Sequence, residues 1–233
     1  MDFEKIYTNG KYFGNNPTWS VEDSAWKGII IESILKRNSI VFNEIIEVGC
    51  GAGKILEYLQ KKNPNQNFLG YDISPQAIDL ALSIKNDSLN FFLADFIESY
   101  NKVTDVILII DVIEHVADYY GFLNKLKPKG KNFVFHIPLD MSVHTVLKPH
   151  INLQQRNSVG HIHYFTKEHV FWMLQDCGYK IINWEFTKPS IDVQPVKGIK
   201  QNIKKVLRNI TFSISKKWSN RFWGNYSLMI LAE

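Results

Sequence analysis

Short apolar runs alternate along the chain with segments of helical periodicity. The run at 105–110 is apolar at every position after Asp105, which is typical of a central strand covered on both faces. Strands that alternate with helices indicate parallel βαβ units. We therefore expect an α/β fold with a doubly wound sheet, built from five βα units and a final strand pair. The expected strands are 44–49, 67–71, 89–93, 105–110, 132–137, 179–186 and 226–232.

Polar side chains mark where several helices begin. Ser74 is able to cap a helix that has Pro75 at its first position. Ser20 with Asp23 resembles a capping box and predicts a helix through about residue 35. Thr166 is able to cap a helix through 175. Further helices are expected over 54–62 and 113–127, and 139–160 has no clean period and is predicted to be a long loop or cap.

The composition is that of a globular protein. With 45% hydrophobic and 13% aromatic residues, the chain is too apolar for a disordered protein. Cys50 and Cys177 are too few for a disulfide scaffold or a zinc–thiolate cluster, and they suit a reducing compartment. The chain has no transmembrane run and no signal peptide at its first residues, so we expect a cytoplasmic protein.

The positive charge of the chain is local. Between Thr187 and Arg221 there are nine basic residues and one acidic residue, which leaves 18 basic and 22 acidic residues elsewhere. Within 197–223, apolar residues fall on one side of a predicted helix and basic residues on the rest. We weigh three roles: a packed helix with a solvated face, contact with an anionic membrane, or lysines offered to a phosphorylated acceptor. The apolar residues are Ile199, Ile203, Val206, Leu207, Ile210 and Ile214.

A glycine-rich turn follows the first expected strand. Gly49, Gly51 and Gly53 allow a sharp turn and a close approach of a ligand to the backbone. The third glycine comes one residue too early for the dinucleotide fingerprint. Asp72, at the end of the second strand, is able to accept hydrogen bonds from both hydroxyls of a ribose. The turn and this acid together predict a nucleoside-binding edge.

Five segments resemble, in order, the motifs of class I S-adenosylmethionine-dependent methyltransferases. The closest resemblance is to the bacterial small-molecule group that includes the ubiquinone-type O-methyltransferases, and it covers about residues 45–186. The segments are Ile45-Ile46-Glu47-Val48-Gly49-Cys50-Gly51-Ala52-Gly53, Tyr71-Asp72-Ile73-Ser74, Ala94-Asp95-Phe96, Asp111-Val112-Ile113-Glu114-His115-Val116 and Leu126-Lys127-Pro128-Lys129-Gly130.

The resemblance implies a Rossmann-like, mostly parallel seven-stranded sheet with the last strand antiparallel, and S-adenosylmethionine as cofactor. It implies a single domain with an N-terminal helical and aromatic segment (1–40), a cofactor-binding core (41–137), a substrate-side loop or cap (138–165) and a basic amphipathic insertion (187–223). The N-terminal segment often folds over cofactor and acceptor in this family.

The same resemblance assigns residues to parts of the cofactor. Asp72 would hold the ribose, and Asp95 and Phe96 would flank the adenine. The methionine part would lie against Glu47, Gly49, Gly51, Asp111 and Val112, and the cofactor-binding residues are also expected to include Cys50, Gly53 and Ile73. Independently of the family, acids at strand ends favour a sulfonium cation and repel a pyrophosphate.

Methyl transfer to a hydroxyl needs a group that removes a proton, and histidine is the usual base near pH 7. His136, at the end of the fifth strand, and His163 are the candidates; the alternative is that they cap loops. His115 is a weaker candidate that can buttress the helix start beside Glu114. No metal is expected, because no carboxylate cluster completes a site with His161 and His163.

We therefore expect methyl transfer to a small molecule, at the hydroxyl of a sugar, glycolipid precursor or quinone-like compound. Three rival functions remain: a nicotinamide-dependent oxidoreductase, a nucleic-acid methyltransferase, and a non-catalytic S-adenosylmethionine-binding protein. The Asn/Asp-Pro-Pro-Tyr tetrapeptide of amino-methylating enzymes is absent, and no nucleic-acid partner is expected. The oligomeric state is left open.

Overall fold

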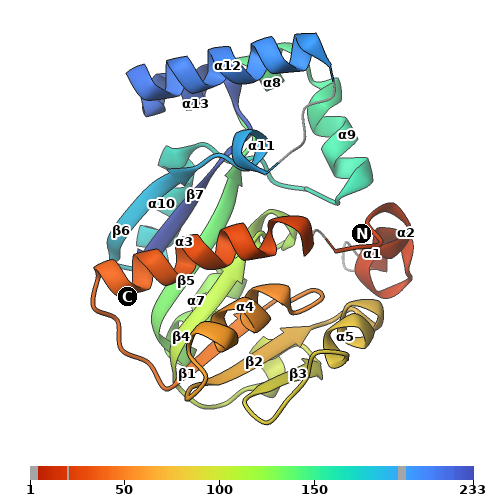
Figure 1. The fold of residues 1–233 in the computed structure, drawn as a ribbon, viewed down its shortest axis with the longest axis vertical. Helices are drawn as coiled ribbons and strands as arrows, with labels where there is room; N and C mark the ends of the chain where they lie inside the picture. Colours follow the sequence, from red (N-terminus) through yellow and green to blue (C-terminus); the bar gives the residue numbers. More distant parts are fainter. Residues whose placement is uncertain (1–4, 20, 194–197) are drawn as a thin grey trace.

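The computed structural model describes residues 5–19, 21–193 and 198–233, and its centre is a sheet with seven strands among those residues (Figure 1). The strand order is β3-β2-β1-β4-β5-β7-β6. The expected doubly wound sheet is confirmed. The first five strands in this order, from β3 across to β5, each pair in parallel with the next, and β7 is antiparallel to both of its neighbours. The strands are β1 Glu44–Val48, β2 Asn67–Asp72, β3 Leu89–Leu93, β4 Thr104–Ile110, β5 Gly130–Leu139, β6 Ile181–Thr187 and β7 Tyr226–Ala232.

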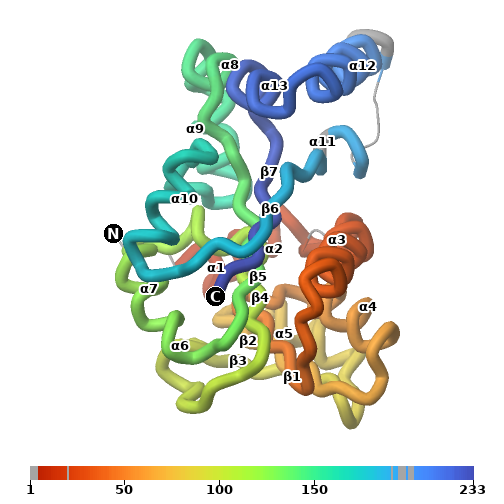
Figure 2. Tube along the Cα trace, turned by 90° about the vertical axis from the view of Figure 1, so that its left-hand side faces the viewer, coloured from red at the N-terminus to blue at the C-terminus, as the bar shows by residue number. Residues whose placement is uncertain are grey.

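Helices cover both faces of the sheet. One apolar core lies between the sheet and α3 (Ser24–Arg37), α4 (Lys54–Lys62) and α5 (Pro75–Leu82). The other lies between the sheet and α7 (Tyr119–Leu126) and α10 (Lys167–Asp176). Figure 2 shows these two layers on opposite sides of the strands. β4 and β7 are apolar along almost their whole length because each of their faces contacts one of these cores.

Several helix starts predicted from capping residues are confirmed. The Ser74 hydroxyl accepts a hydrogen bond from the Ala77 backbone N–H, and Pro75 is the first residue of α5. Thr166 caps α10 in the same way, through the His169 N–H. α4 has the predicted bounds. The predicted cap at Ser20 lies outside the described residues; α3 follows a short 3-10 turn at Val21–Asp23.

The single helix predicted over 113–127 is wrong. A 3-10 turn at Ile113–His115 comes first, and α7 then begins at Tyr119. Asp118 causes the break, because its carboxylate accepts a hydrogen bond from the Gly121 N–H and so caps a new helix. The intervening turn leaves the Glu114 carbonyl free to accept hydrogen bonds from Ile162 and His163.

The segment predicted as a long loop contains two helices, α8 (Val143–Leu147) and α9 (His150–Ser158). Both are too short for their periodicity to be visible in the sequence. Ser142 and Thr145 form a reciprocal capping box at the start of α8. α9 lies beside the N-terminal helices α1 (Lys5–Thr8) and α2 (Lys11–Asn15), and the Asn16 side chain donates a hydrogen bond to the Ser158 carbonyl.

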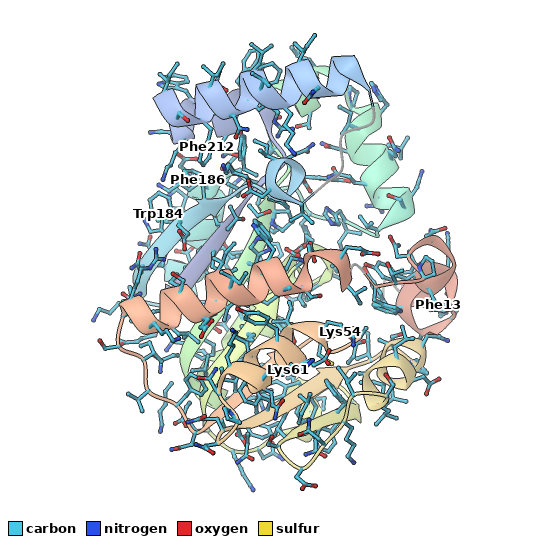
Figure 3. The ribbon with its side chains drawn as sticks, viewed as in Figure 1. Phe13, Lys54, Lys61, Trp184, Phe186 and Phe212 are labelled. Atoms are coloured by element: carbon cyan, nitrogen blue, oxygen red, sulfur yellow. The ribbon has the colours of Figure 1, made fainter. Side chains whose placement is uncertain are left out.

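The basic insertion forms α11 (Pro189–Asp192), α12 (Ile199–Ile214) and α13 (Lys216–Trp223), which lie at one end of the molecule together with α8 (Figure 1). α12 contacts the domain through Phe212, which stacks on Tyr226 and meets Phe186 edge to face. Figure 3 shows Trp184, Phe186 and Phe212 in a column from β6 to α12.

The polar and apolar sides of α12 are reversed relative to a packed amphipathic helix. Arg208 is buried and donates hydrogen bonds to the carbonyls of Gly224 and Asn225. The apolar stripe instead faces outward, and it comprises Ile203, Val206, Leu207, Ile210 and Ile214. The interpretation of this stripe as a packing face is therefore wrong. In the described part of the chain, no helix is both long and apolar enough to cross a membrane.

A matched pair of leucines tests the assignment of the core. Replacing Leu108, which is fully buried in β4, with alanine should lower the free energy of unfolding by about 2–5 kcal/mol, because it removes buried methylenes and leaves a cavity. Leu93→Ala at the exposed end of β3 should change it by less than about 0.5 kcal/mol. Urea denaturation measures both, and equal effects would contradict the packing described.

Candidate functional site

A cavity of about 520 Å³ lies where the strands β1, β2, β4 and β5 end. Ligands of doubly wound sheets bind at this edge, and the volume is in the range of small-molecule sites. The strand ends form its floor. The N-terminal segment adds Tyr7, Tyr12 and Trp19 to the walls, and the neighbouring α9 adds Gln155 and Ser158.

The glycine-rich turn forms one wall because its backbone adopts conformations that suit glycine. Gly49, Gly51 and Gly53 have φ values of 72°, 54° and 72°. The N–H groups of Gly49 and Cys50 donate hydrogen bonds to the Tyr71 carbonyl, at 2.8 and 3.1 Å, which holds the turn against β2. A Cβ on Gly49 would lie 2.7 Å from Val112 Cγ2. The turn therefore brings the backbone and the end of β4 into close contact.

Asp72 is held rigidly beside this turn. Its carboxylate accepts hydrogen bonds from the Gly51 N–H at 2.9 Å and the Ser74 N–H at 2.8 Å. It is 7% exposed and lines the cavity together with Ile73. Burial raises its pKa, although the backbone donors oppose that shift. A fixed carboxylate with lone pairs left over is suited to accept hydrogen bonds from ligand hydroxyls.

Glu47 is a buried acid whose capacity to form hydrogen bonds is not fully used. Its side chain lines the cavity, and its Oε2 atom has no hydrogen-bond partner. Burial raises the pKa of this carboxyl group well above its usual range. A buried polar atom without a partner destabilises the protein, and a ligand that donates a hydrogen bond or carries positive charge relieves the penalty.

A buried polar network crosses the base of the cavity. Lys27 Nζ from α3 lies 2.7 Å from Asp111 Oδ2 and 2.9 Å from Asp23 Oδ2. Asp111 also accepts a hydrogen bond from His136 Nδ1 at 2.6 Å, and His136 Nε2 lies 2.9 Å from the Thr187 hydroxyl. Both ring nitrogens of His136 are therefore engaged. This chain of contacts joins α3, β4, β5 and β6.

Asp111 has an unusual backbone as well as an unusual environment. Its φ of 55° is left-handed, which few residues other than glycine and the small polar ones adopt. Although burial opposes ionisation, His136 and Lys27 hold the pKa of this carboxyl group well below its usual range. The pKa of Lys27 is raised despite its burial, because Asp111 and Asp23 face it. The network is thus an arrangement of fixed charges.

A second polar cluster comprises Glu114, His115 and His161. Glu114 Oε1 lies 3.8 Å from His115 Nε2 and 3.9 Å from His161 Nε2. The Glu114 side chain is fully buried, and neither of its oxygens has a hydrogen-bond partner. Burial and the neighbouring Asp111 raise its pKa to about 8, while burial and His161 lower the pKa of His115 to about 4. All three residues line the cavity.

The N-terminal segment adds an aromatic wall. Tyr12 lies between Tyr7 and Trp19, with ring centroids 5.0 and 4.7 Å away. The Tyr7 hydroxyl is 2.8 Å from His115 Nδ1 and donates a hydrogen bond to the Val159 carbonyl. This segment therefore forms the wall of the cavity that contacts the second polar cluster, through Tyr7 and His115.

Most of the site residues predicted from the sequence line one cavity. Gly53, Asp95, Phe96 and His163 do not. Phe96 is 1% exposed and stacks on Tyr100, so its side chain belongs to the core. The ring of His163 donates to the Val116 carbonyl and packs against Tyr119. The predicted residues on the cavity are Glu47, Gly49, Cys50, Gly51, Asp72, Ile73, Asp111, Val112 and His136.

Sequence reasoning missed Lys27 and the cluster around Glu114. Lys27 gave no signal, because a lysine in a predicted helix is normally exposed. His161 was considered with His163, two residues away, whereas its partner in space is Glu114, 47 positions earlier in the chain. The turn at Ile113–His115, predicted as helix, is what aims Glu114 at the cavity.

Comparisons with known proteins agree on a family. The protein-family model described as a methyltransferase domain matches residues 28–183 of this chain. A ubiquinone biosynthesis O-methyltransferase from Rickettsia bellii is 34% identical over 110 residues, which are 43% of this chain and 45% of that protein. A ribosomal RNA small subunit methyltransferase C from Haemophilus ducreyi is 26% identical over 54% of this chain and 32% of that protein. The chain thus spans less than half the length of these relatives.

Solved structures share the fold at low sequence identity. The plantazolicin methyltransferase BpumL, in complex with a monoazolic desmethylPZN analog and SAH, superposes with a TM-score of 0.64. It is 15% identical, and the match covers 99% of this chain and 92% of that one. A magnesium protoporphyrin IX methyltransferase from Synechocystis with bound SAH has a TM-score of 0.59 at 13% identity, covering 89% and 82% of the two chains.

The buried cation can be tested with a matched pair of lysines. Lys27→Met should lower the free energy of unfolding by about 3–5 kcal/mol, because two acids are left facing each other without their counter-charge. Lys36→Met, which removes an exposed pair with Glu32 on the same helix, should change it by about 1 kcal/mol or less. Chemical denaturation measures both, and a stable Lys27→Met protein would show that the network is dispensable.

Proposed function

The chain belongs to the methyltransferase-domain family, and on that premise we propose that it transfers a methyl group from S-adenosylmethionine to a hydroxyl group of a small molecule. When bound, this cofactor supplies an electrophilic methyl group on a positively charged sulfur. In the transfer, a bond forms between the acceptor oxygen and the methyl carbon while the bond from carbon to sulfur breaks. S-adenosylhomocysteine leaves, and the hydroxyl proton is released.

The single observation that supports this proposal most is the buried set of acids around the glycine turn. Asp72, fixed by two backbone donors, would accept hydrogen bonds from the ribose hydroxyls. Glu47, with its unpartnered oxygen, would receive the ammonium group of the methionine part. The glycine residues have no side chains, which leaves space for the methionine part of the cofactor. A nicotinamide cofactor is disfavoured, because its pyrophosphate would meet these carboxylates.

The adenine would lie beyond Asp72, toward the end of β3. The Ala94 N–H donates a hydrogen bond to the Asp72 carbonyl, which brings the next residue, Asp95, beside the ribose site. One oxygen of Asp95 caps α6 (Phe96–Ser99) through the Ile97 N–H, and we propose that the other accepts from the adenine amine. Since the Phe96 ring is in the core, only its backbone is left to contact the base.

We place the acceptor hydroxyl near Glu114, His115 and His161. His136 is not retained as the base, since both of its ring nitrogens are engaged, and His163 is not retained because it lies off the cavity. The aromatic wall of the N-terminal segment suits the ring of a sugar or quinone-like acceptor. The relatives named for ubiquinone biosynthesis support oxygen as the methylated atom. The acid-lined cavity disfavours a nucleic acid.

The ribose contact gives a direct test. Asp72→Ala should weaken binding of S-adenosylhomocysteine at least tenfold by isothermal titration calorimetry, because a charge-assisted hydrogen bond contributes about 1.5–3 kcal/mol. The matched variant Asp79→Ala, on the exposed side of α5, should bind like the parent. The proposal fails if the parent protein binds no S-adenosylhomocysteine, or binds NADH more tightly.

We further propose that the insertion holds the enzyme on an anionic membrane surface. The neighbouring helices also expose large apolar side chains, namely Trp218 and Phe222 of α13 and Val146 and Leu147 of α8. Residues 198–223 contain no acid, and Lys216 and Lys217 are exposed at the start of α13. An apolar face with a basic border is complementary to anionic lipid headgroups over acyl chains. This position would suit a lipid-linked acceptor such as a glycolipid precursor or a quinone.

Vesicle co-sedimentation tests this surface. The parent should sediment with phosphatidylglycerol-containing vesicles in a salt-sensitive way and only weakly with pure phosphatidylcholine. Lys216→Glu with Lys217→Glu should abolish the salt-sensitive part, and Ile210→Ser with Ile214→Ser should weaken binding to both kinds of vesicle. The matched control Leu82→Ser, an exposed apolar residue on α5, should behave like the parent.

Size-exclusion chromatography of the same variants separates lipid contact from self-association. The membrane proposal expects the parent to elute at the same size as Ile210→Ser with Ile214→Ser. If the parent is a dimer that these serines dissociate, and vesicles do not pellet it, the stripe is a subunit interface and the proposal is overturned. Arg208 is unsuitable for charge reversal here, because its side chain is buried on the side of α12 that contacts Gly224 and Asn225.

A further inference from the structure

The cluster of Glu114, His115 and His161 has the arrangement of a cation site. One carboxylate oxygen and two imidazole nitrogens lie within 4.8 Å of one another. An ion about 2.0–2.2 Å from each donor separates tetrahedral ligands by about 3.3–3.6 Å. The two separations that involve Glu114, 3.8 and 3.9 Å, exceed that by only a few tenths of an ångström. Side-chain rotations that bring the three donors, now within 4.8 Å of one another, closer together would complete the site.

Hydrogen bonds on the far side of each ring fix which nitrogen faces Glu114. His161 Nδ1 lies 2.8 Å from Asp140 Oδ2, and that carboxylate also accepts a hydrogen bond from Gln155. His115 Nδ1 lies 2.8 Å from the Tyr7 hydroxyl and 3.2 Å from the Gly160 carbonyl. In both rings Nδ1 is therefore engaged on the far side, and Nε2 is the nitrogen that faces Glu114. Metal-binding histidines are commonly oriented in this way.

The centre of the arrangement is not satisfied by hydrogen bonds. Both carboxyl oxygens of Glu114 are buried without a hydrogen-bond partner, and the Nε2 atoms of His115 and His161 face this group. Buried polar atoms of this kind are rare in native proteins and call for a specific partner. None of the hydrogen bonds in the described part of the chain supplies one.

We propose that Glu114, His115 and His161 bind a divalent transition-metal ion, with two imidazoles and one carboxylate as ligands. This donor set suits Zn²⁺, Mn²⁺, Fe²⁺ or Co²⁺ better than Mg²⁺ or Ca²⁺, which prefer oxygen ligands. Asp140 and the Gly160 carbonyl orient the two rings. Because all three ligands line the cavity, the remaining coordination positions face the space for water or an acceptor oxygen.

Ion binding does not require that the proposed methyl transfer is correct. With the acceptor hydroxyl beside this cluster, as proposed above, a bound ion would explain why the acceptor binds there. An oxygen bound to a divalent ion has a lowered pKa and releases its proton more readily. The cluster would then activate the acceptor without a free histidine base, in agreement with the engaged nitrogens of His136.

Titration of chelator-treated protein with Co²⁺ tests the site. We expect one equivalent to bind and to produce visible ligand-field absorption bands, which Zn²⁺ should displace. Glu114→Gln and His161→Ala should each weaken binding at least about 100-fold, and Asp140→Asn about 10–100-fold because it only orients His161. His169→Ala, which removes an exposed histidine at the start of α10, should leave both affinity and spectrum unchanged.

Three results would overturn the proposal. The first is no Co²⁺ or Zn²⁺ binding at millimolar concentration. The second is binding that Glu114→Gln and His161→Ala leave unchanged. The third is binding that His169→Ala abolishes. Titration of every variant with S-adenosylhomocysteine shows that the variant is folded, and it separates the outcomes: retained cofactor binding without metal binding refutes only the metal site, and the reverse refutes only the proposed cofactor site.

Discussion

The ion pair between the buried Lys27 and the partly buried Asp111 fixes the arrangement on which the cavity depends. It ties α3 to the end of β4, and through His136 and Thr187 the same network reaches β5 and β6. The strand ends that form the floor are therefore held in one arrangement by charge as well as by the apolar cores. A buried pair of this kind adds little net stability compared with an apolar contact, but its loss is strongly destabilising. Its value lies in the fixed position it gives to Asp111, whose left-handed backbone needs support from its surroundings.

Above this floor the protein keeps several acids that it does not neutralise. Glu47 and Glu114 have buried oxygens without partners, and burial raises the pKa of both. An unliganded protein bears that electrostatic penalty, and a cationic ligand removes it. Buried acids without partners thus make the binding of a hydrogen-bond donor or a positive centre more favourable. The glycine turn adds shape to this preference, because its backbone leaves room where side chains would block a ligand.

Local signals in the sequence predicted much of the fold. Capping by Ser74 and Thr166, the bounds of α4 and the apolar run of β4 depend on neighbouring residues, so they were readable in advance. The cap at Asp118, which divides 113–127, was overlooked, and the short helices α8 and α9 lack a visible period. Contacts between distant residues were out of reach: nothing in the sequence pairs Lys27 with Asp111, or Glu114 with His161. The orientation of α12 was also unreadable, because periodicity shows that a helix has two sides and not which side meets the protein.

On the membrane proposal, the outward stripe of α12 would also set the side from which each reactant arrives. α12 and α8 lie at one end of the molecule, whereas α5 and the strands β2 and β3 lie toward the other (Figure 1). On a bilayer the first end would rest among lipids and the second would point into the aqueous phase. A membrane-borne acceptor would then approach from the end of the molecule that carries α12, and the water-soluble methyl donor from the aqueous phase. Neither reactant would obstruct the path of the other, and the search for the acceptor would take place in two dimensions.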